Sequence, residues 1–236
     1  MKSSSYVSSI NKQSSPYVAI LTGDIVRSSS LPKTRRFDLF HSLQDLSRLI
    51  KQQYPGDVRY DLSKFRGDGW QLLVDPPQKC FEISLFIRTY IRTTFKTEKL
   101  DTRIAIAIGS VEFVPETNIS EGFGIAFTES GKMLDQLKNY RLGITLATKN
   151  GTRYTRLLDT LLKSYDTFIT SWTALQCQAV HLSLQGLTQV KIGKKWQPKP
   201  IDQTTVNKHL AAANWNVIKE GLSVFEVETT RILEEE

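Results

Sequence analysis

The sequence contains little cysteine and no long hydrophobic run. Its two cysteines, Cys80 and Cys177, lack the spacing of a metal site, and His41, His181 and His209 are isolated along the chain. Two widely separated cysteines are typical of buried thiols in a reducing compartment. No segment is long and apolar enough to span a membrane, and the Ser-rich start lacks the apolar core of a signal peptide. We therefore expect a cytoplasmic protein without a disulfide framework or a histidine–cysteine metal centre.

The composition is that of a folded, basic protein. Of its 236 residues, 40% are hydrophobic and 23% are charged, which suffices for a packed core. The formal net charge of +7 favours a polyanionic partner such as a nucleotide or a nucleic acid. The length accommodates one large domain, or a domain of about 150 residues with a small additional module.

The order of expected elements predicts an α/β (α+β) fold with a ferredoxin-like core. In the helix expected at 32–53, Leu39, Leu43, Leu46 and Ile50 recur at helical spacing, so they should face the core. The Gly67-Asp68 region is typical of a hairpin turn. Strand, helix, hairpin, helix and strand then follow one another, as in that fold. The other expected elements are strands at 17–24, 59–65, 70–74, 102–111 and 143–147, and helices at 77–97, 126–140 and 151–164.

Beyond residue 167 the pattern changes from alternating strands to helical patches. Between 171 and 225 six lysines stand against one aspartate and one glutamate. We therefore expect a second, all-helical domain after the α/β domain. The predicted organisation is a disordered leader at 1–15, an α/β domain at 16–167, a helical domain at 168–228 and an acidic tail at 229–236.

Two aspartates occupy positions where a strand is expected to run into a turn, Asp24 in GDIVRSS and Asp68 in SKFRGDGW. Magnesium sites commonly combine one or two carboxylates with substrate phosphates, and the adjacent glycines let a phosphate approach the backbone. The pair therefore predicts a Mg²⁺ or Mn²⁺ site for a phosphorylated ligand. A single aspartate at such a position is also typical of an ordinary turn or helix cap.

The segment 17–139 resembles the catalytic domain of class III nucleotide cyclases through GDIVRSS, KFRGD, RIAIAIGSV and GIAFTESGK. The resemblance implies a ferredoxin-like sandwich in which Asp24 and Asp68 bind the metal, while Lys64 and Glu121 select a purine base. It also implies a head-to-tail homodimer in which each site is shared between two chains.

The sequence departs from that family where active cyclases carry a transition-state Asn and Arg. Thr128 and Lys132 stand there, and lysine lacks the planar two-point contact of arginine. Losing one aligned donor costs about a hundredfold or more in rate. Arg27 and Ser28 replace a usual Gly and Phe, and they offer charge and a hydroxyl to phosphate. The pattern favours binding of a metal and a purine nucleotide over turnover.

The C-terminal part resembles the helix-turn-helix of sigma factors and bacterial repressors. One helix is expected to end near 185, a second to span 188–196, and a recognition helix to begin at Asp202, a typical N-cap. The intervening loop holds two prolines and is about three residues longer than the usual turn. A small helical dimerisation module is the alternative. The residues expected to contact duplex DNA are Gln203, Thr204, Thr205, Asn207 and Lys208.

As a whole, the sequence resembles the bacterial SatD family in its GDIV start, its GDxxQ hairpin and its terminal WTxxQ segment ending in ANW. We expect a DNA-binding transcriptional regulator whose cyclase-like domain binds a metal–nucleotide or a related phosphate ligand. The alternative is an active purine nucleotide cyclase, or a related nucleotidyl transferase, regulated by its helical domain.

Overall fold

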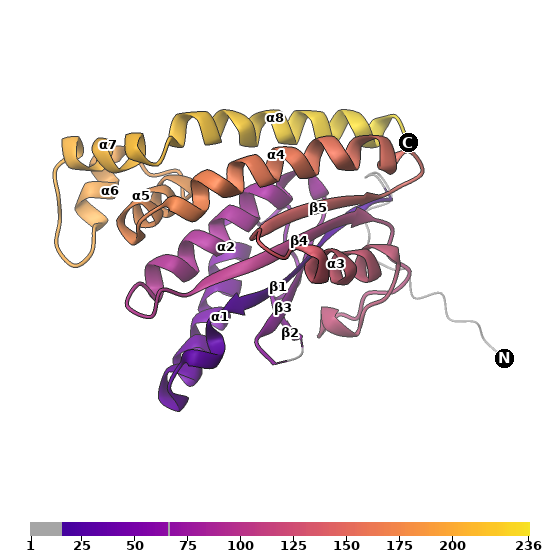
Figure 1. Ribbon diagram of the computed structural model, residues 1–236, viewed down its shortest axis with the longest axis horizontal. Coiled ribbons are helices and arrows are strands. Elements are labelled where there is room, and N and C mark those ends of the chain that lie inside the picture. Colours follow the sequence, from indigo (N-terminus) through magenta and orange to yellow (C-terminus); the bar gives the residue numbers. More distant parts are fainter. Residues whose placement is uncertain (1–15, 66) are drawn as a thin grey trace.

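A computed structural model describes residues 16–65 and 67–236, so the expected leader at 1–15 lies outside the described residues. A five-stranded sheet carries helices on its two faces, and further helices gather beyond one end of it (Figure 1). The mixed α/β fold class expected from the sequence is therefore confirmed. Among the described residues, no helix has the length and apolarity needed to cross a membrane.

The strands follow the order β2-β3-β1-β4-β5 across the sheet. They are β1 (Val18–Val26), β2 (Ser63–Phe65), β3 (Gly69–Val74), β4 (Asp101–Gly109) and β5 (Leu142–Ala147). The helices are α1 (Lys33–Gln53), α2 (Cys80–Thr94), α3 (Ile125–Gln136), α4 (Gly151–Ser171), α5 (Ala174–Leu184), α6 (Gln189–Lys195), α7 (Gln203–Ala212) and α8 (Trp215–Glu234). Three 3-10 turns lie at Ser28–Ser30, Pro77–Lys79 and Ile119–Glu121.

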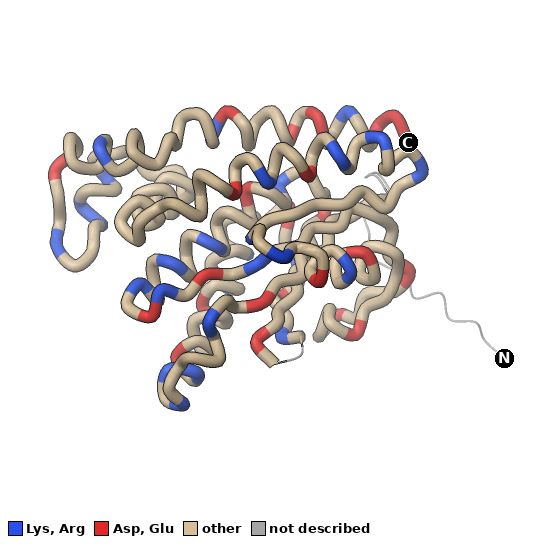
Figure 2. The backbone as a smooth tube through the Cα atoms, in the orientation of Figure 1, with Lys and Arg blue, Asp and Glu red and all other residues tan. Residues whose placement is uncertain are grey.

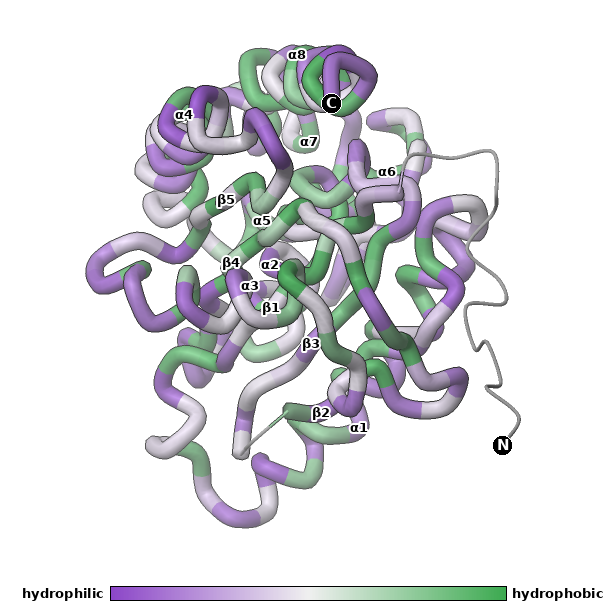
Figure 3. The backbone as a smooth tube through the Cα atoms, turned by 90° about the vertical axis from the view of Figure 1, so that its right-hand side faces the viewer, coloured by the Kyte–Doolittle hydropathy of each residue, from purple (hydrophilic) through white to green (hydrophobic). Residues whose placement is uncertain are grey.

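The first four strands and two helices form the ferredoxin-like core. Strand β1 runs antiparallel to both of its neighbours, β3 and β4, while β2 and β3 form a hairpin. This is the order of two interleaved βαβ units, each split by a strand of the other. Strand β5 extends the sheet in parallel with β4. The hydrophobic segments follow these central strands (Figure 3).

The alternation of β1 decides which residues face which helices. Ala19 and Leu21 belong to the large core on the side of α1 and α2, whereas Val18 and Ile20 pack with the start of α3 on the opposite side. Thr22 continues the α3 side, because its Oγ lies 2.7 Å from the Oγ of Ser130 in α3. Since side chains alternate along a strand, Asp24 also lies on the α3 side.

Several elements differ from the sequence prediction in length. The first hairpin strand begins at Ser63 instead of 59, and α4 continues seven residues past 164 to Ser171. The expected domain boundary at 168 thus falls within α4. Helix α8 continues to Glu234 and returns along α4 (Figure 1), so most of the expected acidic tail at 229–236 is helical. At its end, the Glu236 carboxylate accepts hydrogen bonds from the backbone N–H of Asn150, at 3.0 Å.

A buried arginine joins the sheet to the helices that follow it. The side chain of Arg88 in α2 is fully buried and donates two hydrogen bonds of 2.8 Å to Asp101 in β4. It also donates to Asp166 and Thr170 in α4. A buried cation with several charged acceptors ties three elements to one geometry, because each acceptor would be left unpaired if the elements separated.

Candidate ligand pocket and helical surface

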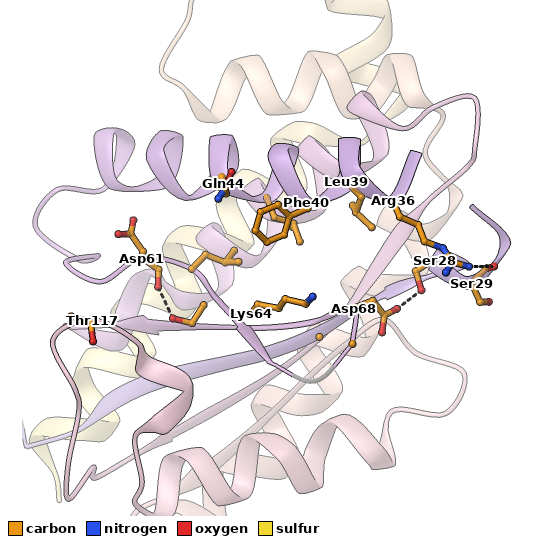
Figure 4. A pocket seen from close by; sticks show the side chains of 15 residues that line it. Ser28, Ser29, Arg36, Leu39, Phe40, Gln44, Asp61, Lys64, Asp68 and Thr117 are labelled. Carbon is orange, nitrogen blue, oxygen red and sulfur yellow. Dashed lines mark hydrogen bonds between the residues drawn. The ribbon is translucent and has the colours of Figure 1, made fainter. Parts of the chain in front are cut away.

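A cavity of 680 Å³ lies between α1 and the β2–β3 hairpin (Figure 4). Its walls are mainly apolar: α1 contributes Leu39, Phe40 and Leu43, and the segment before β2 contributes Leu62. Phe40 is 44% exposed, so its ring is accessible to a ligand. Mostly apolar clefts of this size with a few convergent polar groups are the usual form of small-molecule sites.

Polar residues line both ends of the cavity: Gln44, Asp61 and Thr117 lie at one end, and those of the hairpin and of the turn after β1 lie at the other (Figure 4). Lys64 on β2 is exposed, and its ammonium lies 6.0 Å from the centroid of the Phe40 ring. Ser28 donates a hydrogen bond to the Asp68 carboxylate, which connects the turn after β1 to the hairpin (Figure 4). Arg36 lines the same end and donates to the backbone carbonyls of the preceding turn. One end of the cavity is thus cationic around a single carboxylate.

Asp24 does not line this cavity. It lies inside β1, opposite Arg103 on β4, and the guanidinium contacts both carboxylate oxygens, with the Nε hydrogen bond measuring 2.9 Å. This hydrogen bond raises the pKa of Arg103 above its ordinary value, so the guanidinium keeps its charge. The carboxylate of Asp24 is therefore already neutralised by its neighbour.

Asp24 and Asp68 are both engaged by neighbouring side chains, and their assignment as metal ligands stays a prediction. Asp24 is neutralised by Arg103, and Asp68 accepts a hydrogen bond from Ser28. Within the described part of the chain, no three acidic, histidine or cysteine side chains gather closely enough to hold an ion. A nucleotide could still bring its own magnesium, because one carboxylate plus phosphate oxygens is a common ligand set.

The other residues expected at the nucleotide site lie apart from the cavity. Thr128 and Lys132 are exposed on α3, which packs on the sheet through its other side, and Lys132 forms a 2.7 Å ion pair with Glu129. Glu121 ends a 3-10 turn and accepts a hydrogen bond of 2.9 Å from Asn118. Within one chain, the structure does not bring these three side chains to Asp68. Arg27 lines a different cavity, considered below.

Phe40 and Arg103 were not among the site residues predicted from the sequence. Phe40 lies outside the core-facing stripe of α1. A large apolar residue in such a position was the feature of the sequence that could have indicated a cavity. Arg103 stands in the RIAIAIGSV segment, but its contact with Asp24 depends on the register between β1 and β4. Two residues that face each other on neighbouring strands can be far apart in the sequence, so the Asp24–Arg103 pair could not be predicted from sequence spacing.

The helices α5, α6 and α7 form a compact group with a basic outer surface. Asp202 caps α7 by accepting hydrogen bonds from the backbone N–H and the hydroxyl of Thr205, at 2.8 and 2.9 Å. Val206 and Leu210 of α7 are buried. The Thr205 hydroxyl is thus engaged in the cap, whereas four of the five expected DNA-contacting residues are exposed: Gln203, Thr204, Asn207 and Lys208.

No known family model matches the chain, and no curated protein matches it. The resemblance to the SatD family therefore stays a prediction. Among the solved structures that are similar to the chain, three nucleotide cyclases each match 55% of it. A bacterial light-regulated adenylyl cyclase has 17% identity, a TM-score of 0.39 and 75% of its length covered.

The other two comparisons have the same character. A guanylyl cyclase has 13% identity, a TM-score of 0.42 and 74% of its length covered. The adenylyl cyclase CyaB from P. aeruginosa has 16% identity, a TM-score of 0.41 and 76% of its length covered. Similarity of this degree concerns the arrangement of strands and helices and assigns neither an activity nor a ligand.

Proposed function

We propose that the chain is a DNA-binding regulator whose α/β part binds a nucleotide or a related phosphate ligand between α1 and the β2–β3 hairpin. The observation that carries this proposal is the division of that cavity into an apolar wall and a cationic end. A nucleotide has the matching division, because its base stacks on aromatic rings and its phosphates pair with ammonium and guanidinium groups.

Phe40 and Lys64 are the residues on which ligand selection should depend. The Phe40 ring offers a stacking surface to a base, and the Lys64 ammonium lies beside that ring at the cationic end. Asp68 would face the ribose or a phosphate-bound magnesium, since its carboxylate stands at the same end as Ser28. In this arrangement Asp24 supports the site only indirectly, through its pair with Arg103.

Replacing Phe40 with alanine should weaken nucleotide binding about tenfold or more, because base stacking on one aromatic ring contributes about 1 to 3 kcal/mol. Phe37 is the matched control: it stands on the same helix, is 70% exposed and does not line the cavity, so Phe37→Ala should bind as the parent does. The measurement is calorimetric titration with ATP and GTP, each in magnesium and in chelator. Equal affinities for the Phe40 and Phe37 variants would refute this pocket.

The proposed DNA surface is the outer face of α7 with the lysines of α6 beside it. Lys191, Lys194 and Lys195 are exposed and form no ion pair within the described part of the chain. Together with Lys208 they supply the positive charge that phosphate backbones attract. Asn207, whose side-chain oxygen accepts a 3.2 Å hydrogen bond from Gln189, is placed to present its amide outward.

Lys208→Ala should weaken binding to all duplexes alike and reduce the slope of affinity against salt by about one, because one phosphate contact is lost. Asn207→Ala should instead relax preference at one base position, at a cost of about 1 to 3 kcal/mol. Arg156→Ala serves as the control, because Arg156 is an exposed cation on α4 that forms no ion pair with any residue the structure describes. The measurement is a gel shift across salt concentrations after selection from a random-sequence pool. Absence of retardation at low salt would leave α5 to α7 as a packing module.

Turnover by the cyclase-like part is the alternative function. Thr128 and Lys132 stand on exposed positions of α3, so they could complete a site only by facing the pocket of a second chain. The expected head-to-tail homodimer therefore remains part of the cyclase alternative. Incubation with each nucleoside triphosphate and manganese, followed by chromatography of the products, separates the two proposals.

A further inference from the structure

A second cavity, of 420 Å³, lies where the sheet meets the helical part, and we refer to it as the basic cavity. It is bounded by the end of β1, the turn from α2 to β4, the start of β5 and the junction between α4 and α5. In Figure 2, basic residues gather on the turn that joins α2 to β4. The cationic lining residues are Arg27, Arg92, Lys96, Lys99 and Arg141.

The positive charge of the basic cavity is almost uncompensated. Its one acidic lining residue, Asp101, is already bound through two 2.8 Å hydrogen bonds to the buried Arg88. Glu98, on the same turn, is paired with Arg35 at 2.6 Å. Within the described part of the chain, four of the five cations form no ion pair: Arg27, Lys96, Lys99 and Arg141.

Local backbone groups add to the positive potential. Arg92 donates to the carbonyl oxygens of Ile169, Thr170 and Trp172, so the negative end of α4 is covered by a cation. Ala174, the first residue of the 11-residue helix α5, lines the cavity, which brings the positive end of that helix to the same place. Like charges held around a concave surface repel one another, and the walls concentrate the field inside it.

We propose that the basic cavity binds a small multivalent phosphate anion, such as inorganic triphosphate or the phosphate chain of a nucleotide. Four unpaired cations that converge from three separate segments match an anion with several charged oxygens. The cavity is large enough for a chain of phosphates. It is concave, so a DNA backbone could not run along it. The basic cavity is separate from the pocket beside α1, because the two have no lining residue in common, although Ser28 lines that pocket and its neighbour Arg27 lines this one.

Binding at this place has a structural consequence. The cations come from the residue after β1, the end of α2 with the α2–β4 turn, and the residue before β5, while Thr170, Trp172 and Ala174 come from the junction that leads into α5. An anion in the basic cavity therefore contacts both the sheet and the base of the helical group that carries α7. Its binding stabilises the docked position of α5 by linkage, since only the assembled cavity holds it.

The test is calorimetric titration of the full chain with sodium tripolyphosphate at low ionic strength, with an equal ionic strength of sodium chloride as the blank. Lys96→Glu and Arg141→Gln should each weaken binding about tenfold or more, because each removes a charge-assisted contact. Lys149→Glu is the control, since it makes the same change at the opposite end of α4, a helix of 21 residues and about 30 Å. The affinity of the Lys149→Glu variant should stay within about twofold of the parent, because a charge at that distance is largely screened by salt.

Further arms separate the possible sources of the phosphate. If ATP binding in Phe40→Ala still depends on Lys96, the basic cavity takes nucleotide phosphates. If only tripolyphosphate depends on Lys96, the ligand is a free polyphosphate, and either result supports the proposal. It is overturned if tripolyphosphate does not bind, if Lys149→Glu loses as much affinity as Lys96→Glu, or if Lys96 matters only for duplex DNA. Melting temperatures of the Lys96, Arg141 and Lys149 variants that equal that of the parent in the absence of anion exclude misfolding as the cause of weaker binding.

Discussion

Replacing Arg88 with alanine should lower the free energy of unfolding by about 3 to 5 kcal/mol, the cost expected when one member of a buried charge network is removed. The Arg88 side chain is fully buried and is the hydrogen-bond donor to Asp101, Asp166 and Thr170. Its loss leaves two carboxylates, 15% and 4% exposed, without their main cation. Chemical denaturation followed by circular dichroism measures the difference.

Arg35→Ala is the matched control, because Arg35 also contacts two carboxylates but is 39% exposed. Exposed ion pairs contribute about 0 to 1 kcal/mol, so this variant should remain close to the parent. A loss below about 1 kcal/mol in Arg88→Ala would show that the network contributes no more than a surface pair. It would also remove the reason for treating the sheet and α4 as one cooperative unit.

The pH dependence of the Arg88 variant provides an independent check. In the parent, burial raises the pKa of Asp101 but the charge of Arg88 and its hydrogen bonds lower it, and the net pKa lies below the ordinary value. Asp101 therefore contributes stability above about pH 4 that is lost as the pH falls through its folded pKa. Without Arg88, burial of the Asp101 carboxyl is no longer offset by that cation and favours its protonated form, so the deficit of the variant should shrink as the pH falls from 7 to 4.

The predictable part of the fold was the part set by local periodicity. The apolar repeat of α1 and the Asp-Gly turn of the hairpin are local signals, and α1 ends at Gln53 as the pattern indicated. The starts of α6 and α7 were equally predictable, because the side chains of Thr188 and Asp202 cap the first turn of the helix that follows each of them. Capping residues act within three positions, so they need no knowledge of the tertiary fold.

The unpredictable part depends on contacts between distant segments. The length of α4 exceeded the expectation because Asp166 and Thr170 in its last turns are bound by Arg88 of α2. The Asp24–Arg103 pair depends on strand register, and the basic cavity assembles cations that lie more than a hundred positions apart, such as Arg27 and Arg141. Charge at isolated positions looks like an ordinary solvated surface until the fold brings it together.

Acidification from pH 7 to 4.5 should lower the free energy of unfolding through one identifiable side chain, His181 in α5. Its ring packs 4.4 Å from the ring of Phe86, centroid to centroid, and its Nδ1 lies 3.2 Å from the hydroxyl of Thr89, so α5 is held against α2 through this histidine. Desolvation by burial lowers the pKa of His181 from 6.5 to about 4.

The direction of the effect follows from the proton balance. Below pH 6.5 the unfolded chain protonates this histidine while the folded chain does not, so stability falls by up to 1.36 kcal/mol per pH unit, or about 3 kcal/mol in total by pH 4. His181→Gln should remove this contribution, so the free energy of unfolding of that variant should fall less steeply with pH. His41→Gln, at an exposed position on α1, is the control for loss of a histidine outside the core. Urea titrations at half-unit intervals of pH measure both slopes. If the free energy of unfolding has the same pH slope in the parent and in His181→Gln, the buried ring does not cause the loss of stability in acid. The pH dependence would then come from the carboxylates around Arg88.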